Sequence, residues 1–210
     1  MSGTGILEQW NVLHMYFQLT NTEDRLLSSY FLYSEFSNRF THLYFQFLDY
    51  ALPLTAKFNI TFQSSHSMIH CVVKDECQLY VQILSCFFKP CTLKGPISQV
   101  VKLDPKNQAY HLPANKIYGG IKLARFLETT ASKRDLQSTT QMFEWLLQFL
   151  VELAIQLRQR SLLSNTILSD TCSFLDPQEI IRGSNMSVAN ITAKIPGIVT
   201  EEDEQKLDDE

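Results

Sequence analysis

The hydrophobic pattern is strongest over residues 141–160, QMFEWLLQFLVELAIQLRQR, called here the hub helix. Polar residues recur every four positions and form one narrow stripe, at Glu144, Gln148, Glu152 and Gln156. Apolar residues, among them Trp145 and Phe149, occupy most other positions. This spacing predicts a long helix with almost its whole circumference buried, covered by other helices on at least two sides. Because the polar stripe interrupts the apolar run, no membrane-spanning helix is expected.

The chain before the hub helix also shows helical spacing. Residues 6–19 carry a broad apolar face and are expected to form a short amphipathic helix. A capping box should begin the helix that follows, with two alternatives, Thr20 with Glu23 or Asn21 with Asp24.

Two longer helices come next. Apolar positions from residue 36 to residue 62 keep helical spacing, and Pro53 should kink or divide that helix. A second amphipathic helix is expected over residues 68–87 and ends near Pro90. The simplest topology for these two helices is a helical hairpin.

The pattern weakens on both sides of the hub helix. Residues 91–112 contain three glycine or proline positions and little periodicity, which predicts an extended surface linker. Pro113 suits the first turn of a helix over residues 114–129, although Gly119 and Gly120 weaken its middle. Beyond residue 160, only short helices and an acidic end are expected.

These patterns predict an all-α fold, an irregular helical bundle. We divide the chain into an N-terminal helical hairpin region at 1–90, a linker at 91–112, a C-terminal helical region at 113–199 packed on the hub helix, and an acidic tail at 200–210. Together they are expected to form one domain. No convincing alternation typical of β-strands occurs in the sequence.

Charge is distributed unevenly along the 210 residues. The formal net charge is -4, but residues 201–210 alone contain seven acids and one lysine, so the rest of the chain carries about +2. A body so close to neutral argues against a dominant electrostatic footprint for nucleic acid. Scattered bases could still form a modest patch, namely Lys116, Lys122, Arg125, Lys133 and Arg134.

The cysteines indicate a reducing compartment. Their number is odd, at Cys71, Cys77, Cys86, Cys91 and Cys172, and no signal peptide precedes them. We therefore expect free thiols in an intracellular, non-secreted protein. Three Asn-x-Ser/Thr triplets, at Asn59, Asn185 and Asn190, have no consequence in such a protein.

The sequence contains one weak candidate for a metal site, which we do not predict. His66, His70 and Cys77 fall on one face of a helix and could supply three zinc ligands. Nothing nearby completes a second half of such a site, and a solvent-facing stripe explains the two histidines equally well. The sequence also lacks phosphate-binding, dinucleotide-binding, metalloprotease and serine-hydrolase motifs.

The remaining reactive or stacking residues are expected to be structural. Six carboxylates are candidates for acid–base chemistry but should lie on exposed helix faces, namely Asp49, Asp75, Glu76, Glu128, Glu144 and Glu152. The cysteines have no evident activating base and are expected to be structural thiols. One aromatic row could stack bases but has helical core spacing, at Tyr44, Phe45, Phe47, Tyr50 and Phe58. We predict no catalytic, cofactor-binding or metal-binding residue.

Several stretches, taken in order, carry a family resemblance. They are ILEQWNVLHMYFQ at residues 6–18, then LYFQFLDYALPLTAKFNITFQS with HSMIHCVV, then YVQILSCFFKP, HLPANKIYGGIKLARFL, the hub helix and SFLDPQE. Together they resemble the middle of transposases of the hAT superfamily and of host proteins derived from them. The second and third stretches are similar to the long helical pair of that family's helical insertion. The resemblance covers most of residues 6–182.

The resemblance implies a helical insertion domain of an RNase H-like transposase. The family's enzymes add an N-terminal zinc finger, three metal-binding acidic residues and a C-terminal dimerisation region, and none of these matches this chain. The Arg-Trp-Leu-Ser motif that precedes the first stretch in the family is replaced by MSGTG. No catalytic residue is carried over, so the resemblance implies a protein that is not an enzyme. It also implies a nuclear location, with the cytoplasm as the alternative.

Three functional hypotheses follow from the sequence. The first is a non-catalytic remnant of a domesticated hAT-type transposase, acting as a helical interaction scaffold for a protein partner or for self-association. The second is an auxiliary module that contacts DNA. In the third, the chain is part of a longer transposase-like protein, an expectation based on the acidic segment that the last residues interrupt.

Overall fold

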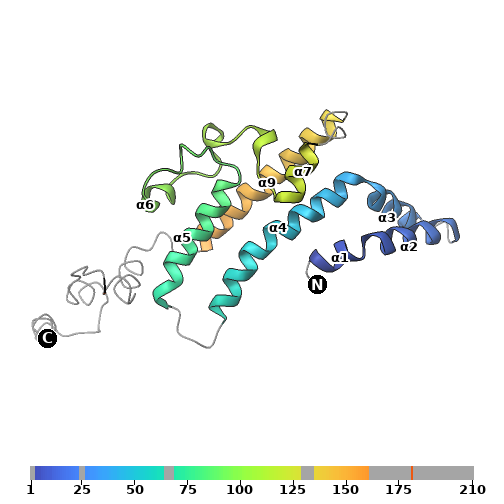
Figure 1. Ribbon diagram of the computed structural model, residues 1–210, viewed down its shortest axis with the longest axis horizontal. Coiled ribbons are helices and arrows are strands. Elements are labelled where there is room, and N and C mark those ends of the chain that lie inside the picture. Colours follow the sequence, from blue (N-terminus) through green and yellow to red (C-terminus); the bar gives the residue numbers. More distant parts are fainter. Residues whose placement is uncertain (1–2, 24–26, 64–68, 129–134, 161–180, 182–210) are drawn as a thin grey trace, which may run out of the picture.

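The computed structural model describes residues 3–23, 27–63, 69–128, 135–160 and 181, and these residues are largely helical (Figure 1). The elements are α1 (Gly3–Glu8), α2 (Trp10–Glu23), α3 (Leu27–Ser37), α4 (Arg39–Phe62), α5 (Ile69–Ser85), α6 (Ile97–Val100), η1 (Gln108–Tyr110), η2 (Ala114–Lys116), α7 (Ile121–Leu127) and α9 (Leu136–Arg160). No strand occurs within these ranges, although an isolated antiparallel bridge joins Phe88 and His111. The all-α prediction is confirmed.

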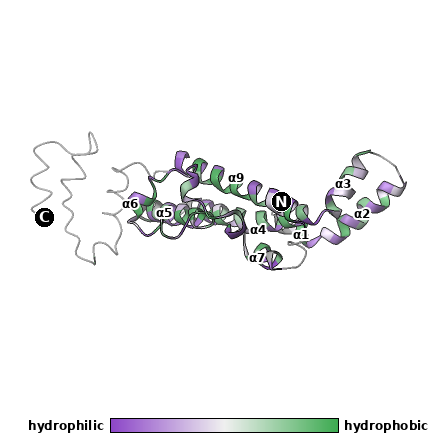
Figure 2. Cartoon of the chain, turned by 90° about the horizontal axis from the view of Figure 1, so that it is seen from above, coloured by the Kyte–Doolittle hydropathy of each residue, from purple (hydrophilic) through white to green (hydrophobic). Residues whose placement is uncertain are grey.

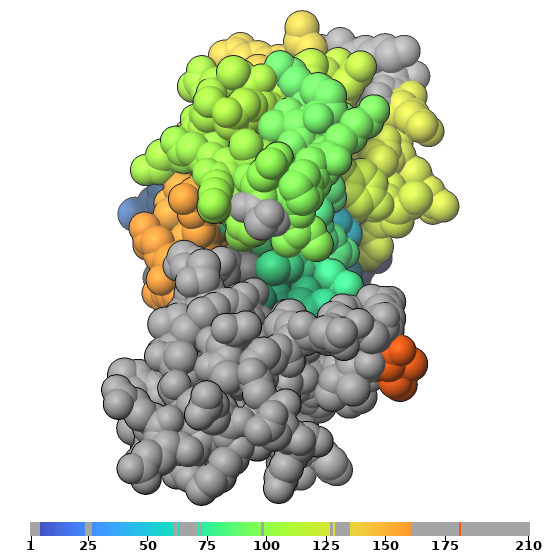
Figure 3. All heavy atoms as spheres, turned by 90° about the vertical axis from the view of Figure 1, so that its left-hand side faces the viewer, coloured from blue at the N-terminus to red at the C-terminus, as the bar shows by residue number. Residues whose placement is uncertain are grey.

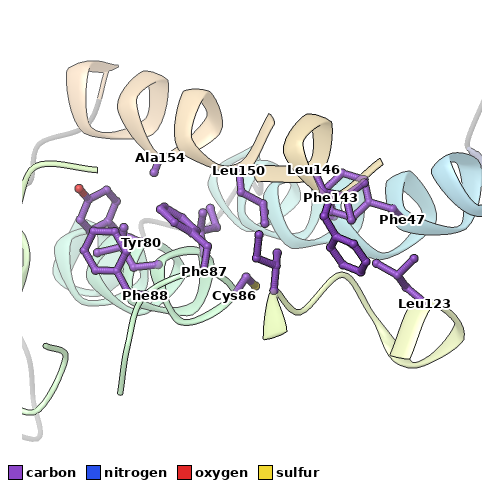
Figure 4. Close-up of a cluster of buried hydrophobic side chains, with 14 of the residues drawn as sticks. Phe47, Tyr80, Cys86, Phe87, Phe88, Leu123, Phe143, Leu146, Leu150 and Ala154 are labelled. Carbon is purple, nitrogen blue, oxygen red and sulfur yellow. The ribbon is translucent and has the colours of Figure 1, made fainter. Parts of the chain in front are cut away.

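The core lies where α9 packs against α4 and α5 (Figure 4). From α9, Phe143, Leu146 and Leu150 point into the core and are almost completely buried. They meet Phe47 from α4 and Tyr80 from α5, which have no exposed surface. Each large apolar side chain buried in this way stabilises the fold by about 1.5 to 3 kcal/mol. The hub helix therefore organises the core, as its sequence predicted.

The hub helix is nevertheless buried on one side only. Its buried side chains fall on a single stripe, at Thr139, Met142, Phe143, Leu146, Leu150 and Ala154. Trp145 is 54% exposed, so the prediction of an almost wholly buried circumference is wrong. The physical reason is that α4, α5 and η2 cover α9 from one side. Phe149 lies at the edge of that contact, half-buried, with its ring 5.3 Å from that of Phe47.

Pro53 does not divide the long helix, contrary to the expectation that it could. Helix α4 runs without a break from Arg39 to Phe62 with Pro53 inside it. Proline lacks the amide hydrogen that a helix interior needs, so one backbone hydrogen bond is lost there. Because Phe47 and Ala51 are buried before the proline and Phe58 packs on the core after it, tertiary contacts hold both halves in place.

The predicted capping box does not form at Thr20, and Asn21 of the other alternative also lies inside α2, while its partner Asp24 lies outside the described residues. Thr20 lies inside α2, and its hydroxyl donates to the carbonyl of Tyr16 at 2.8 Å instead of capping a new helix. Such back-bonding is common for threonine within helices. Observed caps occur elsewhere: Asn38 accepts from the backbone of Phe40 at 2.9 Å before α4, and Asp135 accepts from that of Ser138 at 3.2 Å before α9.

The glycine pair ends the helix that was predicted over residues 114–129. In its place the chain forms η2, an extended passage through Gly119 and Gly120, and then α7. Gly120 has φ +98°, and a Cβ atom there would lie 2.9 Å from Cβ of Tyr50. Only glycine allows both this backbone conformation and this close approach to α4. The glycines were expected to weaken a helix, but they instead allow the chain to pass across α4 in close contact.

The segment predicted as an extended linker, residues 91–112, is folded against the core. It contains α6 and η1, and it buries Val100 and Pro105. The amide of Leu112 donates to the carbonyl of Phe87 at 2.7 Å, and the amide of Lys89 donates to that of Tyr110 at 2.8 Å. These bonds tie both ends of the segment to the end of α5, so the description as an extended linker is wrong.

The helices predicted beyond residue 160 and the acidic tail lie outside the described residues. Among the helices that are described, none combines the length and the hydrophobicity that crossing a membrane requires.

Candidate interaction surface

Helices α2 and α3 form a pair that projects from one end of α4 (Figure 2). The two helices pack mainly on each other, and hydrophobic positions occur on both. Some residues of this pair attach it to the core, and others face outward.

Trp10 is the joint between the pair and the rest of the molecule. It is the one buried side chain of α2, with 8% exposure. Its ring lies 4.6 Å from that of Phe36 in α3 and 4.6 Å from that of His42 in α4. The ring of Phe45 in α4 lies 5.6 Å away, edge-on. Aromatic pairs at these distances add about 0.5 to 1.5 kcal/mol each beyond area burial.

His42 belongs to this joint in its neutral form. Partial burial, followed by the positive charge of Lys122, lowers the pKa of the His42 imidazole from its usual value near 6.5. A neutral ring loses less hydration than an imidazolium when it packs against Trp10. The attachment of α2 to α4 is therefore expected to depend on pH.

Further contacts close the inner side of the pair. His14 Nε2 and Ser37 Oγ lie 3.0 Å apart, and the His14 ring lies 5.3 Å from that of Tyr33. The ring of Phe17 lies 5.2 Å from that of Phe36. The inner face of α2 thus consists of positions 10, 13, 14 and 17, which follow the spacing of one helix face.

A second apolar face of α2 points outward. It has the same spacing, displaced by two residues, and consists of Val12, Met15, Tyr16 and Leu19, with exposures of 67%, 62%, 59% and 58%. Two residues correspond to a rotation of about 200° around a helix. This outer face therefore lies opposite the one that contacts α3 and α4.

Helix α3 repeats the arrangement. Ser29, Tyr33 and Phe36 are buried or half-buried toward α2. Leu27, Tyr30 and Phe31 face outward with exposures of 78%, 56% and 64%. A helix with apolar residues on two opposite sides normally has cover on both. We call these seven exposed residues of α2 and α3 the outer apolar faces.

The outer apolar faces are almost uncharged. Glu23 and Glu35 are the charged residues within α2 and α3. The Glu35 carboxylate accepts a hydrogen bond from Thr41 at 2.7 Å. A surface with so little charge offers no electrostatic attraction for nucleic acid or for an anionic membrane.

The structure describes only part of the His66, His70 and Cys77 group. His66 lies outside the described residues, and His70 and Cys77 lie in α5. Burial, and then the neighbouring Glu76 carboxylate, raises the pKa of the Cys77 thiol and disfavours the thiolate that binds metal. Within the described residues, no three histidine, cysteine or acidic side chains are grouped to hold a metal ion.

The carboxylates occupy different places from one another. Glu128, Glu144 and Glu152 are exposed as predicted, and Asp49 is half-buried with an oxygen 3.3 Å from Lys122 Nζ. Glu76 is only 7% exposed, so its placement on an exposed face was wrong. It occupies the α5 face that also carries Tyr80 and Ile83, and this face turns toward the core.

Asp75 lies instead in an open groove of about 300 Å³ between α4 and α5, with Lys57 on its rim and Leu54, Phe58 and Leu79 among its lining residues. The described residues that line the groove include one acid, Asp75, and one base, Lys57. This lining does not provide the converging pair of carboxylates that acid–base chemistry needs.

Four residues of the aromatic row of α4 belong to the hydrophobic core, as predicted, whereas Phe45 packs against Trp10, with the two rings 5.6 Å apart. Phe47 is fully buried, and Tyr44, Tyr50 and Phe58 pack against the core. The described cysteines are free thiols, of which Cys91 is exposed and Cys86 is buried. Burial raises the pKa of the Cys86 thiol and leaves it unreactive.

The outer apolar faces were not predicted, because residues 6–19 were expected to carry one broad apolar face. The signal was available: positions 10, 13, 14 and 17 and positions 12, 15, 16 and 19 each satisfy helical spacing.

Comparisons with family models, with curated proteins and with solved structures each found no match.

Proposed function

We propose that this protein is a non-catalytic helical interaction scaffold, and that the outer apolar faces of α2 and α3 bind helical segments of a partner protein. The observation that carries the proposal is the exposure of Val12, Met15, Tyr16 and Leu19 at helix-packing spacing on the side away from the core. An exposed apolar patch of this kind marks an interaction site in a folded protein.

The size of the outer apolar faces supports a specific contact. An aromatic side chain can bury about 150 to 250 Å² and an aliphatic one somewhat less, so the seven side chains present roughly 700 Å² in total, divided between two opposite faces. Each face of roughly 350 Å² lies within the range of about 300 to 600 Å² of the largest apolar patch on an ordinary monomer, a patch that is often functional. The two faces together approach the roughly 800 Å² that each partner contributes to a standard interface.

The shape and charge of these faces favour a helical partner. A row at positions i, i+3, i+4 and i+7 is complementary to the apolar stripe of another helix. Because the faces lie on opposite sides of the pair, complete cover requires partner helices on both sides. We therefore expect the pair to become an inner layer of a larger helical assembly.

We further propose that the scaffold derives from an hAT-type transposase and acts without catalysis, in the nucleus. The resemblance of residues 6–182 to the helical insertion of that family motivates the origin. Two-metal phosphoryl transfer requires carboxylates that converge on the ions. The scattered positions of Asp49, Glu128, Glu144 and Glu152 support a role without such chemistry.

Site-specific photocrosslinking in cells tests the docking proposal. A benzophenone side chain replaces Tyr16 on the outer face of α2, and a matched variant carries it in place of Glu152, an exposed polar position of α9. The expected result is a discrete set of protein adducts from position 16 that position 152 does not form. Substituting both Val12 and Met15 by lysine in the position-16 chain should abolish these adducts.

Two results would contradict the proposal. The first is the same adduct pattern from positions 16 and 152, since nonspecific proximity would then explain both. The second is crosslinking from position 16 to the same chain, which would mean that another part of this protein already covers the face.

A second candidate function rests on residues 89–125, called here the basic segment. This segment contains seven of the chain's 18 lysines and arginines but one of its 22 acids, a net charge of +6. The concentration of positive charge favours the hypothesis of an auxiliary module that contacts nucleic acid. Binding of a short DNA duplex measured at two salt concentrations tests it, because phosphate contacts require an affinity that falls steeply with salt. A salt-independent affinity, or no binding, would contradict it.

A further inference from the structure

The basic segment is an ordered surface, and its charges lie on a folded part of the chain. The ammonium group of Lys89 donates to the carbonyl of Ala109 at 2.7 Å, and the amide of Tyr118 donates to the carbonyl of Cys86 at 2.8 Å. Val100 and Pro105 anchor the segment in the core. The segment covers much of the face seen in Figure 3, coloured green to yellow.

Most of its charges point into solvent. Six of the seven basic residues are exposed, namely Lys94, Lys102, Lys106, Lys116, Lys122 and Arg125. Lys122 pairs with Asp49 at 3.3 Å. Among the described residues, the ion pairs include none for Lys94, Lys102 or Lys106. The segment's one acid, Asp104, accepts a hydrogen bond from the backbone amide of Lys106 at 3.0 Å.

Helix α9, the last described helix, ends beside this surface. Arg158, near the end of α9, donates from Nη1 to the carbonyl of Leu103 at 3.1 Å. In Figure 3 the orange end of α9 lies against the green face. Helix α9 therefore ends next to the basic segment.

The acidic tail has the charge that complements this surface. Residues 200–210 carry seven acids and one lysine, a net charge of -6 against +6 on the basic segment. The 39 residues between Arg160 and the tail span up to roughly 130 Å when extended, so the tail can reach every part of the segment. Because the tail is tethered, it acts at a high effective concentration near the basic segment. Ion pairs that are individually weak are then sufficient to hold it there.

We propose that the acidic tail docks on the basic segment of the same chain. The contact would pair the tail carboxylates with the exposed lysines of the segment, so it should be reversible and sensitive to salt. While docked, the tail screens the positive surface from other anionic polymers.

Carbodiimide coupling, which joins lysine amines directly to carboxylates, tests the contact in the full chain. Unlabelled and ¹⁵N-labelled protein are mixed so that links within one chain differ in mass from links between chains. Tail peptides should couple within one chain to Lys94, Lys102, Lys106 or Lys116. They should do so roughly tenfold more than to the exposed Lys57 and Lys74, with the preference lost near 0.5 M salt.

Three coupling results would overturn the proposal: equal coupling to every exposed lysine, coupling mainly between chains, and no coupling of the tail.

A matched pair of variants gives a second measurement. The tail variant carries Glu201→Gln, Glu202→Gln, Asp203→Asn and Glu204→Gln. The control variant carries Glu8→Gln, Glu128→Gln, Glu144→Gln and Glu152→Gln. Both alter the net charge equally.

The tail variant should bind inorganic polyphosphate several-fold more tightly than the control, because its basic segment is no longer screened. Equal affinity of the two variants would overturn the screening. Neither measurement involves the outer apolar faces, so the docking proposal for α2 and α3 stands or fails separately.

Discussion

Replacing Gly120 by alanine should destabilise the protein substantially. The residue has φ +98° and ψ 162°, a region that is essentially restricted to glycine, and forcing another residue into it costs about 1 to 3 kcal/mol. The new Cβ atom would also lie 2.9 Å from Cβ and 3.0 Å from Cγ of Tyr50. Both atoms are close to the α4 backbone and cannot move away easily. Overpacking of this kind adds about 1 to 3 kcal/mol.

The expected total is a loss of roughly 3 kcal/mol, after the smaller entropy gain of alanine in the unfolded chain. For a protein of this length, that loss lowers the melting temperature by about 6 to 12 °C. Calorimetry or urea denaturation of G120A measures it. Gly5→Ala is the matched control, because a Cβ atom there meets nothing within 4 Å and α1 should gain stability. Equal stability of G120A and the parent would refute the described path of residues 117–121 across α4.

Three further predictions concern α4 and α9. Pro53→Ala should stabilise the protein by about 1 to 3 kcal/mol in urea denaturation, because α4 is continuous there and regains a hydrogen bond; destabilisation would indicate that the proline shapes the helix. Phe143→Ala should cost about 3 to 5 kcal/mol, whereas the same change at the exposed Trp145 should cost under about 1 kcal/mol; equal losses would contradict the one-sided burial of α9. Stability should also fall as the pH drops from 7 through the lowered pKa of His42, since the unfolded chain takes up the proton first. His42→Gln should reduce that pH dependence, and an unchanged profile would show that another group is responsible.

Helical periodicity predicted the core because it depends on residues that repeat along one face. Phe143, Leu146 and Leu150 were identified in this way, and so was the structural role of Phe47. Periodicity could not show how many sides of a helix are covered. Trp145 and Leu150 look equally apolar in the sequence, and only the positions of α4 and α5 determine which of them is buried.

Local signals failed where tertiary contacts decided the outcome. Pro53 suggested a break, but packing on both sides of it kept α4 continuous. Gly119 and Gly120 suggested a weak helix, but contact with α4 requires an extended crossing. The outer apolar faces could have been predicted by searching residues 6–19 for a second stripe, because Val12 and Leu19 fit one.

The charge pattern was visible in the sequence only in part. The acidic tail was identified, but the bases were described as scattered because the count was averaged over residues 1–199. The bases could be recognised as one group only from the structure, in which residues 89–125 fold against α5 and α9. The hydrogen bond from Arg158 to Leu103, 55 residues away, could not be predicted from sequence spacing.

Hydroxyl-radical footprinting tests most directly whether the outer apolar faces are open in the isolated protein and covered in the cell. In purified protein, Met15, Tyr16 and Phe31 should be oxidised as fast as the exposed Trp145, whereas Tyr80 and Phe47 should be protected. In cells, oxidation of Met15, Tyr16 and Phe31 should fall several-fold while Trp145 stays unchanged. Protection of Tyr16 in the purified chain, or equal rates for the outer faces in both settings, would contradict a docking role for α2 and α3.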